Sequence, residues 1–315
     1  MKVLVTPTSF KPDMGGPILD LLRSFSQDLV FNPKGKPLTE EELIPLLNGC
    51  KGYIAGLDYI TRKVIKNAPD LKVISRYGAG VDRVDLEAAR EKGIIVCNTP
   101  GVNANAVADL AIGLLLCVTR KIPYLDQKTR GGEWLRSNGI EVYGKTMCLL
   151  GLGAIGKAVA KRASGFSMKI LAYDPFINRE YAEANGIIPV SLDEGIREAD
   201  FISLHLPLIP ETRGIISAEL MKSMKKGAII INTARGGLID EDAAYELLKS
   251  GQLGGLGLDV FEVEPPVTSP LFELNNVVFT PHTGAHTAEA TAAMAELSVR
   301  NLIDVLSGRE NPNII

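Results

Sequence analysis

The chain has 315 residues, 46% of them hydrophobic and 23% charged, which is the balance of a globular protein with room for two domains. Its 34 Lys and Arg residues and 37 Asp and Glu residues leave a net charge of −3, and there is no dense basic run, which argues against nucleic acid or an anionic membrane as a partner. The four cysteines stand singly, without the spacing of metal ligands, and no signal peptide or membrane-spanning stretch is visible. We therefore expect a cytoplasmic protein with reduced cysteines and no metal site.

Short apolar runs alternate with helical stretches along the whole chain, which predicts an α/β fold with mainly parallel sheets. The first expected strands cover residues 2–5, 52–55, 71–75 and 93–97, with a helix over 85–92. Next, the nearly uncharged stretch 103–122 predicts a long buried helix. A second series of expected strands covers residues 145–151, 168–174, 199–207, 227–232, 254–260 and 276–282. Another long helix is expected after Gly284.

A dinucleotide-binding pattern opens the second series. Gly151, Gly153 and Gly156 form a GxGxxG motif directly after a strand and directly before a helix, and Asp174 ends the next strand, 18 residues past Gly156. Such glycines let the backbone approach a pyrophosphate, and the helix N-terminus supplies unpaired amides. A carboxylate at Asp174 accepts hydrogen bonds from a ribose 2′-hydroxyl but repels a 2′-phosphate. The pattern therefore predicts NAD rather than NADP.

Side chains with catalytic chemistry follow the last expected strands. Arg235 comes after the strand 227–232, Asp259 and Glu264 after the next, and His282 after the one that follows. Each has an ordinary structural interpretation alone, but ligands of open parallel sheets bind outside the carboxyl ends of the strands, so together they indicate a site. Arg235 is the sharpest signal, because an Arg close to a core needs an anionic partner.

Several motifs make the pattern specific: GLGAIG, HLPLIPETRGII, INTARGGLIDE, LDVFEVEPP and TPHTGAHT. In this order they resemble the D-isomer-specific 2-hydroxyacid dehydrogenase family, and the segment ISRYGAGVDRVDLEAAREKGIIVCNTPG is similar to its phosphoglycerate dehydrogenase-like branch. The resemblance implies two Rossmann-like lobes, doubly wound parallel sheets with the active site in the cleft between them. Residues 1–100 plus 285–315 would form the substrate-binding (catalytic) lobe, to which the final helix returns, and residues 101–284 the dinucleotide-binding lobe.

The resemblance also assigns the catalytic roles. It implies that Arg235 grips the substrate carboxylate, that His282 is the acid–base residue and that Glu264 is its carboxylate partner. The planar fork of Arg suits a carboxylate, and a nearby carboxylate favours the imidazolium that protonates a carbonyl oxygen while NADH supplies a hydride. The implied activity is that of an NAD-dependent oxidoreductase acting on the CH–OH group of 2-hydroxy acids.

Further residues are carried over from the same resemblance. The substrate-binding residues would be Tyr77, Gly78, Ala79 and Gly80, whose loop amides form a small anion nest, together with Arg235 and His282. Asn103 and Val107 would lie at the nicotinamide pocket, and Asp259 near the carboxamide. The expected cofactor-binding residues are Gly151, Gly153, Ala154, Ile155, Gly156, Asp174, His205, Pro207, Thr212, Thr233, Ala234, Asp259, His282, Gly284 and Val107. We interpret His205, despite its place near the cofactor, and His286 as structural.

The substrate stays open at this point. Ala55 and Gly56 stand where phosphoglycerate enzymes have an Arg, and the sequence ends at Ile315 without the regulatory extension that many of them carry. Arg76 and Arg136 remain as possible phosphate ligands, although Arg76 can equally be an ordinary surface charge. The alternatives are therefore oxidation of 3-phosphoglycerate and reduction of glyoxylate or hydroxypyruvate.

Two other classes of function compete with an enzyme of this family. A non-catalytic NAD-sensing, corepressor-like protein can keep the same residues, although the chain lacks a basic patch. A methyltransferase would use the GxGxxG motif but leaves the Arg, Glu and His set unexplained. The apolar helix 103–120 and the lone Trp134 indicate a homodimer built through the cofactor lobe.

Overall fold

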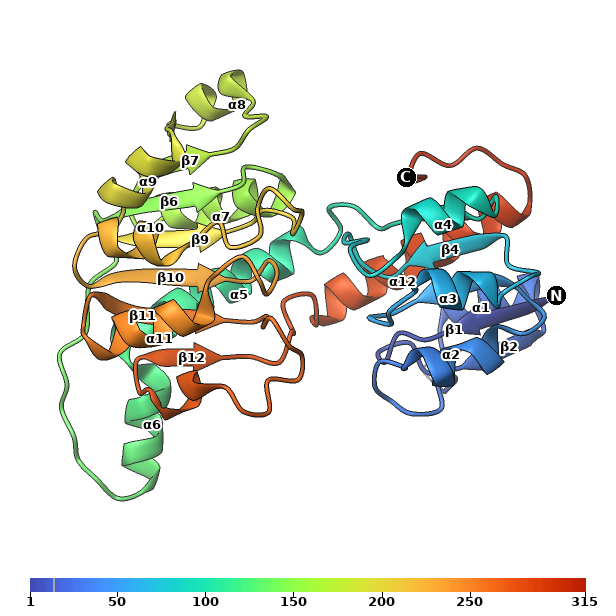
Figure 1. Cartoon of the computed structure of the whole chain (residues 1–315), viewed down its shortest axis with the longest axis horizontal. Helices are drawn as coiled ribbons and strands as arrows, with labels where there is room; N and C mark the ends of the chain where they lie inside the picture. The colour runs from blue at the N-terminus through green and yellow to red at the C-terminus, as the bar shows by residue number, and fades with distance from the viewer. Residues whose placement is uncertain (14) are drawn as a thin grey trace. The chain divides into compact units, whose positions relative to one another are not determined.

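The computed structural model describes residues 1–13 and 15–315 and divides the chain into two compact units. Unit 1 comprises Met1–Asn103 and His286–Ile315, and unit 2 comprises Ala104–Ala285. The lobe boundaries expected from the resemblance, 100/101 and 284/285, lie three residues and one residue from these. Each unit is built on a parallel sheet with helices on both faces (Figure 1), which confirms the α/β fold predicted from the alternation of apolar runs and helical stretches.

The sheet of unit 1 has the strand order β2-β1-β3-β4-β5. The strands are β1 (Lys2–Val5), β2 (Asp28–Phe31), β3 (Cys50–Ala55), β4 (Val73–Arg76) and β5 (Ile95–Cys97). Side chains alternate between two cores, since Val3 and Val5 lie in one and Leu4 in the other. The first core includes residues of α1 (Pro17–Phe25) and α12 (Ala288–Leu306), and the second includes residues of α2 (Glu40–Leu47), α3 (Arg62–Lys66) and α4 (Leu86–Glu91).

The sheet of unit 2 has the order β12-β11-β10-β9-β6-β7-β8. Its strands are β6 (Thr146–Leu150), β7 (Lys169–Tyr173), β8 (Ile187–Pro189), β9 (Phe201–Leu204), β10 (Ala228–Asn232), β11 (Leu253–Leu258) and β12 (Val277–Phe279). From β6 the chain moves outward through β7 and β8, and then returns to the other side of β6 with β9 to β12. The junction of β6 and β9 is therefore the point where the strand order reverses, and ligands of such sheets bind at this point.

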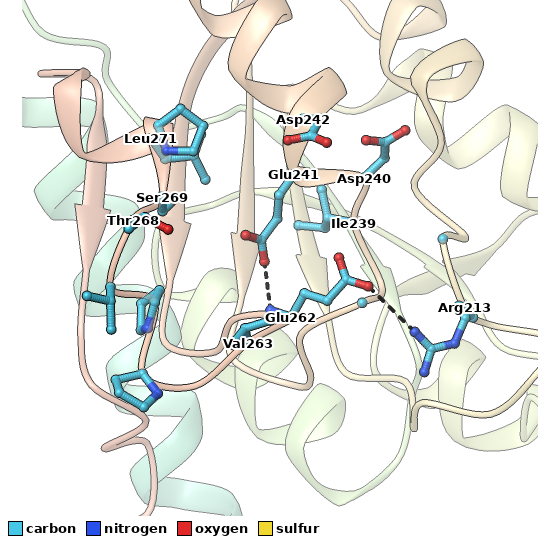
Figure 2. Close-up of a pocket in the computed structure, with 16 residues that line it drawn as sticks. Arg213, Ile239, Asp240, Glu241, Asp242, Glu262, Val263, Thr268, Ser269 and Leu271 are labelled. Atoms are coloured by element: carbon cyan, nitrogen blue, oxygen red, sulfur yellow. Dashed lines mark hydrogen bonds and ion pairs between the residues drawn. The ribbon is translucent and has the colours of Figure 1, made fainter.

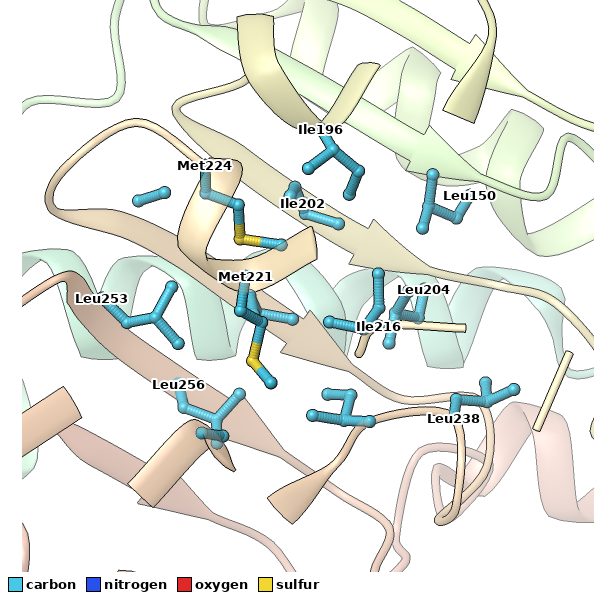
Figure 3. Close-up of a cluster of buried hydrophobic side chains, with 14 of the residues drawn as sticks. Leu150, Ile196, Ile202, Leu204, Ile216, Met221, Met224, Leu238, Leu253 and Leu256 are labelled. Carbon is cyan, nitrogen blue, oxygen red and sulfur yellow. The ribbon is translucent and has the colours of Figure 1, made fainter. Parts of the chain in front are cut away.

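Two layers of helices cover this second sheet. The helices of unit 2 are α5 (Ala104–Arg120), α6 (Ile122–Arg130), α7 (Ala154–Ser164), α8 (Arg179–Ala184), α9 (Leu192–Glu198), α10 (Ala218–Ser223) and α11 (Glu241–Lys249), with a 3₁₀ turn, η1 (Pro270–Glu273). Ile230 of β10 packs in the core that includes residues of α9 to α11, whereas Ile229 and Ile231 pack in the core that includes α5 and α7. Figure 3 shows the first of these cores, where Met221 and Met224 lie over Ile202 and Leu256.

The long apolar helix is explained by contacts within one chain. Helix α5 packs against α7, β10, β11 and β12, and Ala108, Ala111 and Leu115 are almost fully buried there. These contacts within unit 2 bury much of the helix, and the homodimer expected from this helix and Trp134 stays a prediction. The helix stops at Arg120, and Lys121 adopts a left-handed conformation (φ 55°) before α6 begins, so the single helix expected over 103–122 is broken at this residue. Within the ranges given above, no helix is both long and apolar enough to cross a membrane.

Candidate active site

The glycine-rich turn joins β6 to α7 as the GxGxxG motif predicts. Gly151 has φ 102°, and a Cβ there would lie 2.7 Å from the carbonyl oxygen of His205. A Cβ on Gly156 would lie 2.1 Å from the carbonyl oxygen of Gly151, so both glycines are required by close packing. Around Gly153 a Cβ would meet nothing within 4 Å. The turn is thus tight on its inner side and open at Gly153, where the amides of Ala154 and Ile155 begin the helix and can bind an anion.

Asp174 lies directly beyond β7 and joins the end of this strand to the glycine turn. Its Oδ2 accepts a hydrogen bond from Leu152 N (2.8 Å), and its Oδ1 accepts one from Phe176 N (2.8 Å). A carboxylate oxygen can accept more than one hydrogen bond, so both oxygens remain able to receive hydroxyl groups of a ligand. The backbone therefore orients Asp174 beside the turn, as a ribose-binding carboxylate requires.

Buried polar atoms at the ends of β9 and β10 point to a ligand. His205 Nε2 lies 2.9 Å from Ser203 Oγ, whereas His205 Nδ1 is buried and, among the residues that the structure describes, has no hydrogen-bond partner. The same is true of Thr233 Oγ1 and of Asn103 Oδ1 in unit 1. Burial lowers the pKa of His205 to about 3, so its imidazole is neutral at physiological pH. The unpaired buried atoms of His205 and Thr233, which follow β9 and β10 within unit 2, fit a polar ligand such as NAD, which would supply their partners.

The loop between His205 and Thr212 is held by one hydroxyl group. Thr212 Oγ1 donates to the carbonyl oxygen of Pro207 (2.6 Å) and accepts from Ile209 N (2.9 Å). Thr212 and Pro207, both expected at the cofactor, therefore shape this loop, which follows β9 at the point where the strand order reverses.

Arg235 follows β10 on a turn that is built by a buried asparagine. Asn232, 1% exposed, donates from Nδ2 to the carbonyl oxygen of Arg235 (2.8 Å) and accepts at Oδ1 from Ala234 N (3.0 Å). The half-buried Arg235 donates from Nη1 to the carbonyl oxygen of Ala234 (2.7 Å). The role of Asn232 was not predicted, although an Asn at the end of a strand is a common signal of this kind of turn.

Glu264 and His282 form a pair at the ends of the next two strands. His282 Nδ1 lies 3.0 Å and 3.1 Å from the two carboxylate oxygens of Glu264, and the side chains of His282 and Glu264 are 24% and 18% exposed, respectively. The contact fixes the orientation of the imidazole ring. Since Glu264 engages Nδ1, Nε2 is the nitrogen that can exchange a proton with a substrate.

Asp259 organises the loop that carries His282. The buried carboxylate accepts from Thr280 Oγ1 (2.6 Å) and Thr283 N (2.8 Å) at Oδ1, and from Gly284 N (2.8 Å) at Oδ2. The carbonyl oxygen of Asp259 also accepts from His282 N (2.8 Å), and His282 adopts a left-handed conformation (φ 53°). Asp259 was expected only near the nicotinamide carboxamide, whereas these contacts show that it also holds the loop after β12. Thr280 was not predicted, because a Thr at a strand end carries no distinctive signal.

Val107 and Gly284 lie beside this carboxylate. A Cβ on Gly284 would lie 3.0 Å from Asp259 Oδ2 and 3.4 Å from Cγ2 of Val107. The structure therefore brings Val107, Asp259 and Gly284 together, three residues that are far apart in the sequence and that the resemblance assigns to one pocket.

The loop Tyr77–Gly80 belongs to unit 1 and follows β4. Gly78 (φ 142°) donates from its amide to Thr99 Oγ1 (2.9 Å), so amide contacts to an anion would come from Ala79 and Gly80. The phenol of Tyr77 donates to the carbonyl oxygen of Thr291 (2.8 Å). The loop is therefore rigidly attached to its own unit.

Arg76 holds the other side of this loop. Its guanidinium donates from Nε to the carbonyl oxygen of Gly80 (3.2 Å) and from Nη1 to that of Ala55 (3.0 Å). The residue is 3% exposed, so the interpretation of Arg76 as an ordinary surface charge was wrong.

Arg136, the other candidate ligand for a phosphate, is exposed on the segment that follows α6. Across the described part of the chain, no group of three or more His, Cys, Asp or Glu side chains could hold a metal ion.

Comparisons with known proteins agree with this geometry. Residues 112–284 match the sequence model described as "D-isomer specific 2-hydroxyacid dehydrogenase, NAD binding domain". The chain is 48% identical over 282 residues to a D-3-phosphoglycerate dehydrogenase of Methanocaldococcus jannaschii, covering 88% of this chain and 54% of the relative. It is 45% identical over 267 residues to a glyoxylate reductase of Thermococcus litoralis, covering 82% and 81%.

A solved structure extends the likeness to the whole chain. A crystal structure of a protein from Thermus thermophilus is 41% identical and superposes with a TM-score of 0.88, covering 100% of both chains. The chain spans about half the length of the phosphoglycerate dehydrogenase and about four fifths of the glyoxylate reductase. The fold, the matched NAD binding domain and the relatives together show that this chain belongs to the D-isomer specific 2-hydroxyacid dehydrogenase family.

Proposed function

We propose that the protein is an NAD-dependent D-2-hydroxyacid dehydrogenase that interconverts a small 2-oxo acid and its 2-hydroxy acid. The observation that carries the proposal is the contact of His282 Nδ1 with a carboxylate oxygen of Glu264 at 3.0 Å. The two residues follow β11 and β12 of the NAD binding domain, and Arg235 follows the neighbouring strand β10. An acid–base imidazole, its carboxylate partner and a cation for the substrate carboxylate are the groups that carbonyl reduction by a hydride requires.

The reaction requires a hydride donor, a group that binds the substrate carboxylate and a group that transfers a proton. Bound NADH supplies the hydride for the carbonyl carbon. Arg235 would bind the carboxylate of the 2-oxo acid through its planar fork, which orients the carbonyl group. His282, protonated and held at Nδ1 by Glu264, would donate the proton on Nε2 to the carbonyl oxygen. In the oxidation direction neutral His282 would accept the hydroxyl proton, and Glu264 would stabilise the imidazolium that forms.

The position of Asp174 supports NAD rather than NADP as the cofactor. Its carboxylate is fixed beside the glycine turn by Leu152 N and Phe176 N, where it would accept hydrogen bonds from ribose hydroxyls. A 2′-phosphate at the same place would meet a carboxylate of like charge. The remaining expected cofactor residues lie in this turn or in the loops that follow β9 to β12, and Val107 of α5 lies beside Gly284.

The end of β3 and the environment of Arg76 favour a small substrate without a phosphate group. A Cβ on Gly56 would lie 3.0 Å from Cα of Pro7, so this position is closely packed, and the neighbouring Ala55 supplies only its carbonyl oxygen to Arg76. Because Arg76 is buried and donates to two carbonyl oxygens, its role is better explained by the loop Tyr77–Gly80 than by a phosphate. We therefore propose glyoxylate or hydroxypyruvate as the substrate ahead of 3-phosphohydroxypyruvate.

Exposed apolar side chains after α5 support a homodimer through the cofactor unit. Trp134 is 84% exposed and Tyr143 is 71% exposed, and Ile122, Leu135 and Ile140 are also exposed on the segment 122–143. Such a concentration of exposed apolar side chains is typical of an interaction surface. A monomeric mass by light scattering at micromolar protein would contradict this proposal.

We also propose a cytoplasmic location, because all four cysteines are free thiols, as in a reducing compartment.

The proposed activity is tested by following NADH absorbance with glyoxylate, hydroxypyruvate, pyruvate and 3-phosphohydroxypyruvate. We expect turnover of a small unphosphorylated acid, and loss of at least about a hundredfold in kcat for His282→Ala. His286→Ala, a change at a histidine outside the catalytic pair, is the matched control and should keep full activity. If NADH binds but none of the acids is reduced faster than by His282→Ala, a non-catalytic NAD sensor replaces the enzyme as the better proposal. Preference for the phosphorylated acid would restore the phosphoglycerate alternative.

A further inference from the structure

The segments that carry Arg235 and Glu264 touch through their backbones. A Cβ on Gly236 would lie 1.9 Å from the carbonyl oxygen of Phe261 and 2.5 Å from the nitrogen of Glu262, distances that no side chain can occupy. Gly236 follows Arg235 directly, and Phe261 and Glu262 lie shortly before Glu264 in the sequence. The glycine therefore permits direct contact between the segment after β10 and the segment after β11.

A side chain makes a second contact between the same two segments. Glu241, the first residue of α11, accepts a hydrogen bond at Oε1 from the backbone nitrogen of Glu262 (2.9 Å), as Figure 2 shows. Burial raises the pKa of the Glu241 carboxyl. The charged side chains around it are those of Asp240, Asp242 and Glu262, and Glu262 is itself 3.8 Å from Arg213.

The helix that carries Glu241 is firmly anchored. Asp240 caps α11 by accepting from Ala243 N (3.0 Å), and Leu238 and Ile239 are buried just before it. Ala244 and Leu248 of the same helix lie in the core of unit 2. Glu241 therefore holds Glu262 from a fixed position, and the segment between Arg235 and α11 cannot shift independently of the core.

The held backbone in turn determines where the Glu264 carboxylate lies. Glu264 Oε1 accepts a hydrogen bond from Phe261 N (3.3 Å), and both of its oxygens contact His282 Nδ1. We infer that Glu241 is a positioning residue: through Glu262 N, and together with the contact at Gly236, it fixes the Glu264–His282 pair relative to Arg235. This inference rests on the proposed dehydrogenase function, in which Arg235 orients the substrate and His282 transfers the proton.

Two substitutions at Glu241 separate positioning from a general loss of structure. Glu241→Ala removes the hydrogen bond, while Glu241→Gln keeps an amide oxygen that can accept from Glu262 N. Glu241 and Glu262 line a cavity of about 560 Å³, so water can solvate the freed amide and the Ala variant should remain folded. Asp242→Ala, at the neighbouring residue on the same helix turn, is the matched control for loss of a negative charge.

We expect kcat for the 2-oxo acid to fall about tenfold or more in Glu241→Ala, because small misplacements of catalytic groups are costly, with a smaller change in KM and an unchanged Kd for NADH. Glu241→Gln should restore kcat to within about threefold of the wild type, and Asp242→Ala should match the wild type. Equal kcat values in the Ala variant and the wild type would overturn the inference. So would an equal loss in the Ala and Gln variants, which would assign the effect to the charge.

Hydrogen exchange supplies a readout that does not depend on turnover. In Glu241→Ala the amides of residues 261–264 should exchange at least about tenfold faster than in the wild type, because the hydrogen bond from Glu262 N is lost. Glu241→Gln and Asp242→Ala should show wild-type exchange there. If the wild type reduces no acid while exchange changes as expected, the proposed function fails and the positioning of this segment stands. Unchanged exchange in Glu241→Ala would refute the contact itself.

Discussion

Replacing Asp259 by Asn should both lower the stability of unit 2 and impair the proton transfer assigned to His282. In the wild type, Oδ1 accepts from Thr280 Oγ1 and Thr283 N, while Oδ2 accepts from Gly284 N. An Asn would best direct its single oxygen at the two donors and its NH₂ group at the buried Gly284 N–H, placing a donor against a donor. One unpaired buried amide and the loss of charge on the remaining bonds together cost about 2–4 kcal/mol. For a unit of this size, that lowers the Tm by about 4–16 °C.

Thermal unfolding followed by circular dichroism measures this cost, and steady-state kinetics at a temperature well below the Tm measures the effect on His282. We expect kcat to fall about tenfold or more even where the protein is folded, because the left-handed backbone of His282 depends on this loop. Thr280→Val removes one donor while keeping the shape, and should cost about 1 kcal/mol. A Tm within about 2 °C of the wild type for Asp259→Asn would refute the reasoning.

Other consequences can be measured in the same preparations. Arg235→Lys should raise KM for the 2-oxo acid about tenfold or more, with the Kd for NADH unchanged in a fluorescence titration, because an ammonium cannot replace the two-point contact. Asp174→Ala should reduce the preference for NADH over NADPH by about tenfold or more in kcat/KM, since a like charge near a 2′-phosphate is removed. The pKa of His205 is lowered from 6.5 to about 3 in the folded state, so as the pH falls below 6.5 this histidine is protonated in the unfolded state before it is in the folded state. The stability that His205 contributes above pH 6.5 is therefore lost as the pH falls towards 3, by up to about 1.4 kcal/mol per pH unit. Urea unfolding of His205→Gln between about pH 4 and 7 should show a flatter dependence on pH. Arg76→Ala should raise KM for the acid and leave the Kd for NADH unchanged, because it loosens the loop up to Gly80.

The sequence predicted the central strands well because parallel strands buried on both faces appear as continuous apolar runs. The strand Ala228–Asn232, buried at every position, is the clearest case. The strands β2 and β8 were missed, and both lie at sheet edges. Asp28 of β2 and Ile188 of β8 are exposed, and β8 ends at Pro189, so neither segment is a continuous buried run like those of the central strands.

The catalytic candidates were accessible to sequence analysis because few residue types carry proton transfer or carboxylate binding. Arg235, Glu264 and His282 could be named from motifs, and their spacing after successive strands indicated one edge of the sheet. Which partner holds each side chain could not be read from the sequence. The carboxylate of Asp259 contacts residues 21 to 25 positions away, and such contacts depend on the register of β11 and β12. The same limit applies to Arg76, whose buried guanidinium was indistinguishable from a surface charge.

The two glycines after Arg235 show why geometry is needed to interpret even a recognised motif. Gly237 has φ 76°, a left-handed backbone that disfavours any other residue at this position. Gly236 has no such backbone requirement but lies against the carbonyl oxygen of Phe261, so a side chain there would separate the segments of Arg235 and Glu264. In the sequence both are simply glycines of a turn. The first shapes the turn itself, whereas the second sets the distance between two catalytic groups, and this difference makes Gly236→Ala a change that should impair catalysis more than local folding.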